Sequence, residues 1–119
     1  MICRLIPPAL LVLVCLPACS AIGDYQPHDG DVIFQTSRSS QSLAIQLATK
    51  SPYSHMGIVY VGRDGQASVF EAVQPVKLTP LVEWVARGEG RHFVARRLVN
   101  SDTVLTPEKL TKMKEVGQS

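Results

Sequence analysis

Residues 53–72 read YSHMGIVYVGRDGQASVFEA and decide the fold. Two apolar segments, 53–61 and 67–72, lie on either side of a Gly-Arg-Asp-Gly turn at residues 62–65. Segments with β-branched residues that flank such a turn are typical of a β-hairpin. A hairpin in the middle of the chain predicts an antiparallel sheet.

Further strands and helices are predicted on both sides of this hairpin. Strands are expected at residues 31–35, 76–78 and 92–98, and helices at 41–50, 80–87 and 107–116. Leu43 and Leu47 lie four residues apart and give the first helix an apolar face. Threonine–proline pairs at residues 79–80 and 106–107 place a cap and a proline at the start of the other two helices. The order indicates an α+β fold, an antiparallel sheet with flanking helices.

Residues 1–23 differ in composition from the rest of the chain. Arg4 supplies one positive charge, residues 5–16 form an uncharged apolar segment, and small residues follow it. This is the three-part plan of a secretory signal. The apolar segment is shorter than the roughly 20 residues that span a bilayer. The sequence therefore predicts export from the cytoplasm.

Two processing sites are compatible with this signal. The LPAC sequence at residues 16–19 resembles a lipobox, in which the cysteine is lipidated and becomes the new N-terminus. The alternative is ordinary cleavage near Ala21. We expect the lipobox form, with a lipoprotein signal peptide at residues 1–18, a lipid on Cys19 that anchors the protein to the membrane, and a linker at residues 19–29. The serine after the cysteine implies, by resemblance to envelope lipoproteins, an outer-membrane lipoprotein on the periplasmic side.

Charge and cysteine content exclude several classes of protein. The chain has 12 basic and 10 acidic residues, a formal net charge of +2, so we expect no nucleic-acid binding. Its three cysteines are Cys3, Cys15 and Cys19, all in the signal segment. The remaining domain therefore has no disulfide, no thiolate metal ligand and no thiol nucleophile of its own.

His55 and Glu71 are the candidate catalytic residues. Each places a titratable side chain in an apolar strand, where burial is costly unless the group is paired. If the hairpin loop is centred on Arg63, with three or five residues, His55 faces Glu71 directly and the carboxylate can orient the imidazole. A four-residue loop pairs His55 with Ala72 and puts Glu71 on the other face. Gly57, on the face of His55, would leave space beside the imidazole.

Two other interpretations of these residues remain open. His55 and Glu71 could form a polar pair without any chemistry. They could also bind zinc with His28 or His92 as a third ligand, but no HExxH or CxxC spacing supports this, and we expect no metal.

Several segments together resemble a known family. They are GDVIFQTSRSSQS at residues 30–42, AIQLAT at 44–49, YSH at 53–55, FEAV at 70–73, PVK at 75–77, TPL at 79–81 and RR at 96–97. This set resembles the YiiX/YebB-like permuted papain-like cysteine amidases, relatives of the bacterial cell-wall cysteine peptidases. The resemblance covers residues 24–119. It implies that residues 30–119 form the N-terminal part of a circularly permuted papain-like domain.

The resemblance assigns roles to His55 and Glu71 and implies a nucleophile that this sequence lacks. In the family the histidine strand comes first, the acidic strand next and the cysteine last, in a Cys-Ser-Glu motif that opens a helix. It implies that His55 is the general base, that Glu71 orients it, and that no metal or organic cofactor is needed. Tyr53 and Ser54 lie close enough in sequence to line the site, or simply to pack at the start of the strand. The sequence ends at Ser119 before any such cysteine motif, so the domain is expected to be incomplete at its C-terminus.

A truncated gene product, a cysteine half on another chain and an inactive remnant each explain the missing nucleophile, and we expect truncation. Loss of the cysteine helix would expose apolar surface around Ile33, Val59 and Val94. The function implied by the resemblance is cysteine-type hydrolysis of an amide, peptide or acyl bond in the cell envelope, with this chain inactive on its own. The alternative is a non-catalytic envelope lipoprotein that binds peptide or lipid.

Overall fold

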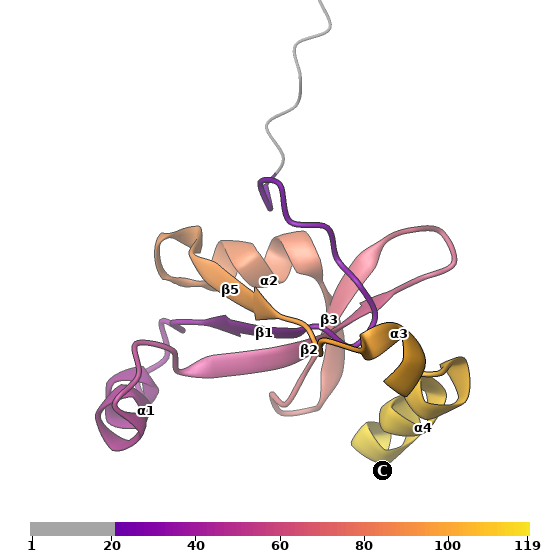
Figure 1. Ribbon diagram of the computed structural model, residues 1–119. Helices are drawn as coiled ribbons and strands as arrows, with labels where there is room; N and C mark the ends of the chain where they lie inside the picture. Colours follow the sequence, from indigo (N-terminus) through magenta and orange to yellow (C-terminus); the bar gives the residue numbers. More distant parts are fainter. Residues whose placement is uncertain (1–20) are drawn as a thin grey trace, which may run out of the picture.

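The computed structural model describes residues 21–119, so the predicted signal peptide and Cys19 lie outside the described part of the chain (Figure 1). The strands are β1 (Val32–Gln35), β2 (His55–Val61), β3 (Ala67–Glu71), β4 (Lys77–Pro80) and β5 (Phe93–Arg96). The helices are α1 (Ser42–Thr49), α2 (Leu81–Arg87), the 3-10 turn η1 (Glu89–Arg91), α3 (Ser101–Val104) and α4 (Pro107–Gln118). No helix among these residues is long and apolar enough to cross a bilayer.

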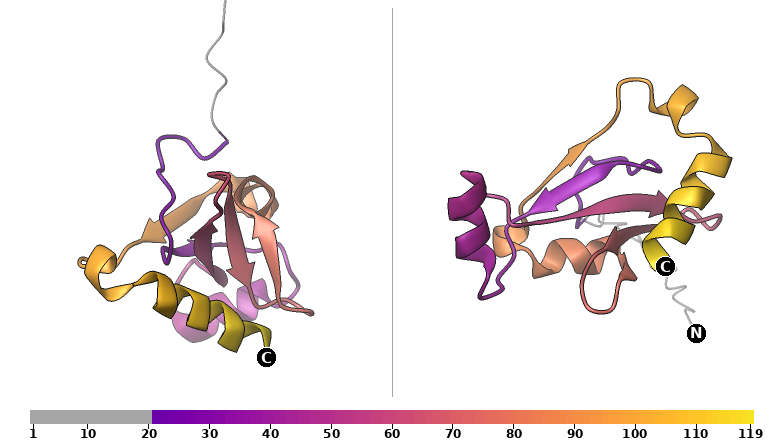
Figure 2. Two further views of the ribbon diagram at one scale, coloured as in Figure 1. Left: turned by 90° about the vertical axis from the view of Figure 1, so that its right-hand side faces the viewer. Right: turned by 90° about the horizontal axis from the view of Figure 1, so that it is seen from below.

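The five strands form one sheet in the order β4-β3-β2-β1-β5, and every neighbouring pair is antiparallel. This confirms the predicted α+β class. Helix α2 covers one face of the sheet (Figure 1). Helix α1 lies beyond one end of the sheet and α4 beside the other, as both views of Figure 2 show together with Figure 1.

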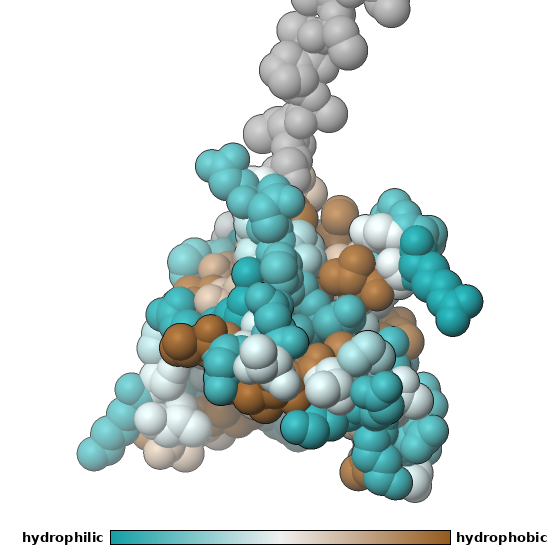
Figure 3. Space-filling model, turned by 45° about the vertical axis from the view of Figure 1, so that its right-hand side comes forward, coloured by the Kyte–Doolittle hydropathy of each residue, from teal (hydrophilic) through white to brown (hydrophobic). Residues whose placement is uncertain are grey.

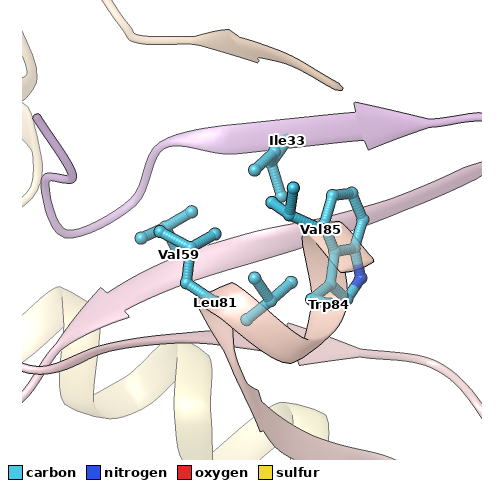
Figure 4. Close-up of a cluster of buried hydrophobic side chains, with 6 residues drawn as sticks. Ile33, Val59, Leu81, Trp84 and Val85 are labelled. Atoms are coloured by element: carbon cyan, nitrogen blue, oxygen red, sulfur yellow. The ribbon is translucent and has the colours of Figure 1, made fainter. Parts of the chain in front are cut away.

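The core lies between the sheet and α2. It contains Ile33, Val59, Val69, Leu81, Trp84 and Val85, each at most 2% exposed (Figure 4). Alternate residues of each strand point to this face, so β1, β2 and β3 each contribute one core residue. The expectation that Ile33 and Val59 would be left uncovered is therefore wrong, because α2 covers both. Val94 is half-buried on β5.

The opposite face of the sheet is only partly covered. Helix α4 lies against one part of it, with Lys114 4.3 Å above the ring of Tyr60 and Gly117 against the ring of Phe70. Met56 and Leu78 remain exposed. Figure 3 shows apolar side chains among hydrophilic ones on the molecular surface.

Helix α1 does not pack its apolar face against the sheet. Leu43 is 65% exposed and Leu47 is 71% exposed, and the buried residue of the helix is Ser42. The predicted apolar face exists in the sequence, but in the described part of the chain it has no apolar surface against it. Its exposed leucines leave a second apolar surface near the open face of the sheet.

Helix boundaries differ from the prediction at one of the two threonine–proline pairs. Thr106 caps α4 as expected, since its hydroxyl accepts a hydrogen bond from the Lys109 amide and Pro107 is the first helical residue. Thr79 and Pro80 instead end β4, and α2 begins at Leu81. The Thr79 hydroxyl is used elsewhere, as a hydrogen-bond donor to Glu71. The single turns η1 and α3 were not predicted.

An ion pair between the buried Asp31 and the exposed Arg97 ties the segment before β1 to the segment after β5. Asp31 is 1% exposed, and Arg97 donates to both of its carboxylate oxygens, at 2.7 and 2.9 Å. The Tyr25 hydroxyl donates to Oδ2 at 2.6 Å. Burial alone would raise the pKa of Asp31, but the hydrogen bonds from Arg97 and Tyr25 outweigh it, so the pKa lies below its usual value.

The register of the central hairpin brings Gly57 into close contact with β3. Ile58 pairs with Phe70 and Val59 with Val69, so continuing the register by one residue puts Gly57 opposite Glu71. A methyl group on Gly57 would lie 2.2 Å from Val69 Cγ1 and 2.9 Å from the Phe70 carbonyl oxygen. The expected free space beside the imidazole is therefore not there, because Val69 occupies the position next to this glycine.

We expect Gly57→Ala to lower the free energy of unfolding by about 2 kcal/mol, because the carbonyl cannot move without disturbing the β2–β3 pairing. Urea unfolding followed by circular dichroism measures the change. Gly62→Ala is the control, since a methyl group there would meet the movable side chain of Asp64, and its effect should be clearly smaller. Equal stability of the Gly57 variant and the native chain would show that the strands separate easily at this point.

The buried Asp31 carboxylate also predicts a pH dependence of stability. Its folded pKa is below the ordinary value of 3.8, so its contribution is present above pH 3.8 and is lost as pH falls through the folded pKa. Asp31→Asn should therefore cost about 2 kcal/mol at pH 7 and progressively less below pH 3.8. Thermal unfolding from pH 2 to 7 tests this, with the exposed Asp24→Asn as control. A cost for Asp31→Asn that is constant over this range would contradict the assignment.

Candidate active site

The structure brings His55 and Glu71 together, at the start of β2 and the end of β3. His55 Nε2 donates a hydrogen bond to Glu71 Oε2 at 2.6 Å. Neither of the two registers considered from the sequence is formed, because the five-residue loop 62–66 is centred on Asp64. Glu71 therefore lies opposite Gly57, and His55 reaches it diagonally. A shift of two positions keeps both side chains on one face, and a diagonal neighbour is within reach of long side chains.

Glu71 is buried and accepts three hydrogen bonds. It is 1% exposed, and its Oε1 accepts a hydrogen bond from Thr79 Oγ1 at 2.5 Å and a second one from Arg87. Burial disfavours the charged carboxylate, but the bonds from Thr79 and His55 and the charge of Arg87 outweigh it and lower the pKa of Glu71. The carboxylate is thus held ionised at neutral pH.

His55 is fixed by two contacts and keeps one ring nitrogen available. Its ring lies 5.9 Å from that of Trp84, stacked at an interplanar angle of 27°, and its side chain is 20% exposed. Because Nε2 donates to an ionised carboxylate, Nδ1 is the unprotonated nitrogen of the neutral ring. Nδ1 makes no hydrogen bond with any residue in 21–119, so it can accept a proton from a reacting group.

Two grooves meet at His55. The apolar groove has a volume of about 710 Å³. It is lined by Phe34, Ile45, Thr49, Ser51, Tyr53, Ser54, His55, Met56, Ala72, Val94 and Arg96. The serine–arginine groove has a volume of about 1050 Å³. It is lined by Gln35, Ser37, Arg38, Ser39, Gln41, Ile45, Ser54, His55, Ala72, Val73, Gln74, Ala86 and Arg87. The imidazole therefore faces both an apolar and a polar binding surface.

Ser54 and Tyr53 both line the apolar groove, and Ser54 also lines the polar one. The Ser54 hydroxyl accepts a hydrogen bond from the Ser37 amide at 2.8 Å and is 2.6 Å from the Ser42 hydroxyl. It joins the start of β2 to the loop before α1. The Tyr53 hydroxyl lies 3.4 Å from His92 Nε2, with the two rings stacked.

The other two histidines lie away from the His55–Glu71 pair. His92 contacts Tyr53, and the His28 amide donates to Asp31 Oδ2 at 3.1 Å. Within the described residues, no group of three or more His, Cys, Asp or Glu side chains could hold a metal ion. The alternative zinc site made of His55, Glu71 and His28 or His92 is therefore not formed.

Sequence reasoning missed three residues that hold the pair in place. Thr79 was assigned to a helix cap, Arg87 to a helix end, and Trp84 to no role. Thr79 could have been found from its place on β4. It pairs with Val69 and therefore lies on the same face of the sheet as Glu71. Arg87 and Trp84 carry no such signal, because they reach the site only through the packing of α2.

Comparison with known proteins identifies the family of the chain. Residues 26–116 match the family described as permuted papain-like amidase enzyme, YaeF/YiiX, C92 family. The chain is 48% identical over 103 residues to the uncharacterized protein YiiX of Escherichia coli strain K12, covering 87% of this chain and 48% of that protein.

A solved structure is also similar. The crystal structure of metalloprotein yiiX from Escherichia coli O157:H7 superposes with a TM-score of 0.67 at 50% sequence identity, covering 79% of this chain and 50% of that chain. The present chain thus spans about half the length of both relatives. On the family match and these identities, the chain belongs to the permuted papain-like amidase family.

Proposed function

We propose that this chain supplies the histidine–glutamate part of a cysteine-type hydrolase that cleaves an amide, peptide or acyl bond in the cell envelope. The observation that carries the proposal is the 2.6 Å bond from His55 Nε2 to the buried Glu71, which leaves Nδ1 beside two grooves. A base held by a carboxylate and open to substrate is the arrangement that activates a thiol.

The nucleophile has to come from outside residues 21–119, which contain no cysteine. The two relatives are about twice as long as their matched parts, and their unmatched half is the proposed source. The apolar groove, with Phe34, Met56 and Val94, offers that segment a surface that ends at His55. In this proposal the chain alone has no hydrolytic activity.

The proposed reaction has two steps. His55 Nδ1 takes the thiol proton, and the thiolate attacks the carbonyl carbon of the substrate. The C–N or C–O bond then breaks, the imidazolium gives its proton to the leaving group, and a thioester remains. A water molecule deprotonated by His55 next hydrolyses the thioester and releases the acid and the thiol. Glu71 stabilises the imidazolium in both steps.

A chimera tests the proposal. Residues 21–119 would be joined to the unmatched half of Escherichia coli YiiX, and labelling by a cysteine-directed activity probe would be compared with that of the unmodified chain. We expect labelling of the chimera only. His55→Ala should slow it by about a thousandfold, because the general base is lost. Glu71→Gln should have a smaller effect, since the base remains.

His28→Ala is the matched control, because this exposed histidine lies outside the two grooves. It should label like the unmodified chimera. Labelling that is insensitive to His55, or His55-dependent hydrolysis by the unmodified chain, would show the proposal to be wrong.

We also propose that the protein is an outer-membrane lipoprotein anchored through Cys19. The support is the LPAC sequence at residues 16–19, followed by a serine. Expressed in a Gram-negative host, the chain should incorporate labelled palmitate and fractionate with the outer membrane, and Cys19→Ala should abolish both. Cys15→Ala is the control, since it removes a cysteine from the apolar segment and should keep the label. A mature N-terminus at Ala21 or Ile22 would instead establish ordinary cleavage.

A further inference from the structure

We propose that Arg87 is a positioning residue of the active site, which keeps the imidazole of His55 neutral by offsetting the charge of Glu71. The inference rests on the proposed function, in which His55 Nδ1 takes a proton from a thiol. An imidazole can do this only while its ring is neutral, since an imidazolium carries a proton on both nitrogens. The charge around the carboxylate therefore decides whether His55 is ready to act as a base.

Glu71 on its own would favour the wrong form of the ring at rest. Its Oε2 lies 2.6 Å from His55 Nε2, and the Glu71 side chain is 0% exposed. A carboxylate at this distance stabilises the imidazolium, and it does so more strongly where water is excluded. A buried histidine–glutamate pair with no further charge would therefore favour the ion pair, in which Nδ1 already carries a proton.

Arg87 supplies the opposite charge at the other oxygen of the same carboxylate. Its Nη2 donates to Glu71 Oε1, which also accepts a hydrogen bond from Thr79. Arg87 and Glu71 together carry no net charge, so the imidazolium gains less from the two than it would from the carboxylate alone. Oε2 still accepts the bond from His55 Nε2, so the orientation of the ring is kept.

The packing of α2 brings Arg87 to this oxygen. Trp84 is buried in the core and stacks on the His55 ring, and Arg87 follows it by three residues, on the same side of the helix. The Arg87 side chain is 46% exposed, but its Nη2 contacts the buried carboxylate directly. One helix therefore holds the imidazole through Trp84 and sets its charge through Arg87.

The other charged groups near the imidazole have no bond to its carboxylate partner. In the described part of the chain, those that line the two grooves with His55 are Arg38, before α1, and Arg96 on β5. Tyr53 adds a titratable phenol to the apolar groove. Both arginines are exposed and form no ion pair with a described residue, so water and salt screen their charges. Arg87 is therefore the cation that should affect His55 most.

The charge state of His55 is measured by NMR of the full chain, produced with ¹⁵N-labelled histidine. The ring-nitrogen signals distinguish a neutral ring with its proton on Nε2 from an imidazolium. In the native chain at pH 7 we expect the neutral ring. Arg87→Gln keeps an N–H donor but loses the charge, so its imidazolium should persist to a pH about one unit higher than in the native chain. Arg87→Lys restores the charge and should restore most of the native behaviour.

Two matched variants separate the charge of Arg87 from other effects. Thr79→Val removes the other hydrogen bond to Oε1 without changing the charge, and its shift should be clearly smaller. Arg91→Gln removes an exposed arginine that lies outside both grooves and forms no ion pair within residues 21–119, and it should have no effect. The ring of His28, away from the pair, is an internal control in every sample.

Several results would overturn the proposal. An imidazolium at His55 in the native chain at pH 7 would do so without any variant. An unchanged His55 in Arg87→Gln would also do so. Equal shifts in Arg87→Gln and Thr79→Val would show that hydrogen bonding to Oε1, and not charge, sets the state of the ring.

The NMR experiment involves no nucleophile, so its outcome is independent of the hydrolysis assay. Its failure would remove the role of Arg87 and leave the roles of His55 and Glu71 intact. The expected NMR result in a chimera that stays unlabelled by the activity probe would overturn the hydrolase proposal alone.

Discussion

The buried carboxylate of Glu71 is the constraint on which the rest of this structure depends. A charged group that is 1% exposed is tolerated only when its oxygens are paired, and three elements provide the partners. β4 supplies Thr79, α2 supplies Arg87, and β2 supplies His55. The carboxylate thereby fixes how α2 lies across the sheet. The same contacts that satisfy the charge also set the orientation of the imidazole.

The two faces of the sheet follow from this arrangement. Helix α2 covers one face of the sheet, and the core on this face contains Ile33, Val59 and Trp84. This face ends at the polar side chains around His55. On the opposite face, α4 covers Tyr60 and Phe70, and Met56 is exposed. His55 lies where the covered and open faces meet, so it lines both the apolar and the serine–arginine groove.

The sequence predicted the elements well and their contacts less well. The hairpin, the α+β class and the Thr106 cap followed from local patterns of turn residues, alternation and capping, which act over a few positions. The register could not be chosen from the sequence, because the Gly-Arg-Asp-Gly turn is compatible with more than one loop centre and a shift of the centre changes which residues face each other. Trp84 and Arg87 were missed because they reach the site only through the packing of α2, which no local pattern encodes. The pairing of His55 with Glu71 was predicted correctly only because a shift of two residues leaves both on one face.

In the proposed lipoprotein, the clamp formed by Tyr25, Asp31 and Arg97 would limit how far the domain can move from the membrane. Tyr25 is held to the body of the domain, and it is the sixth residue after Cys19. A fully extended chain spans about 3.4 Å per residue, so this tether reaches at most roughly 20 Å. With a lipid on Cys19, the domain would stay within about its own radius of the bilayer surface. Substrates attached to distant layers of the envelope would then be out of its reach, and those close to the membrane would be favoured.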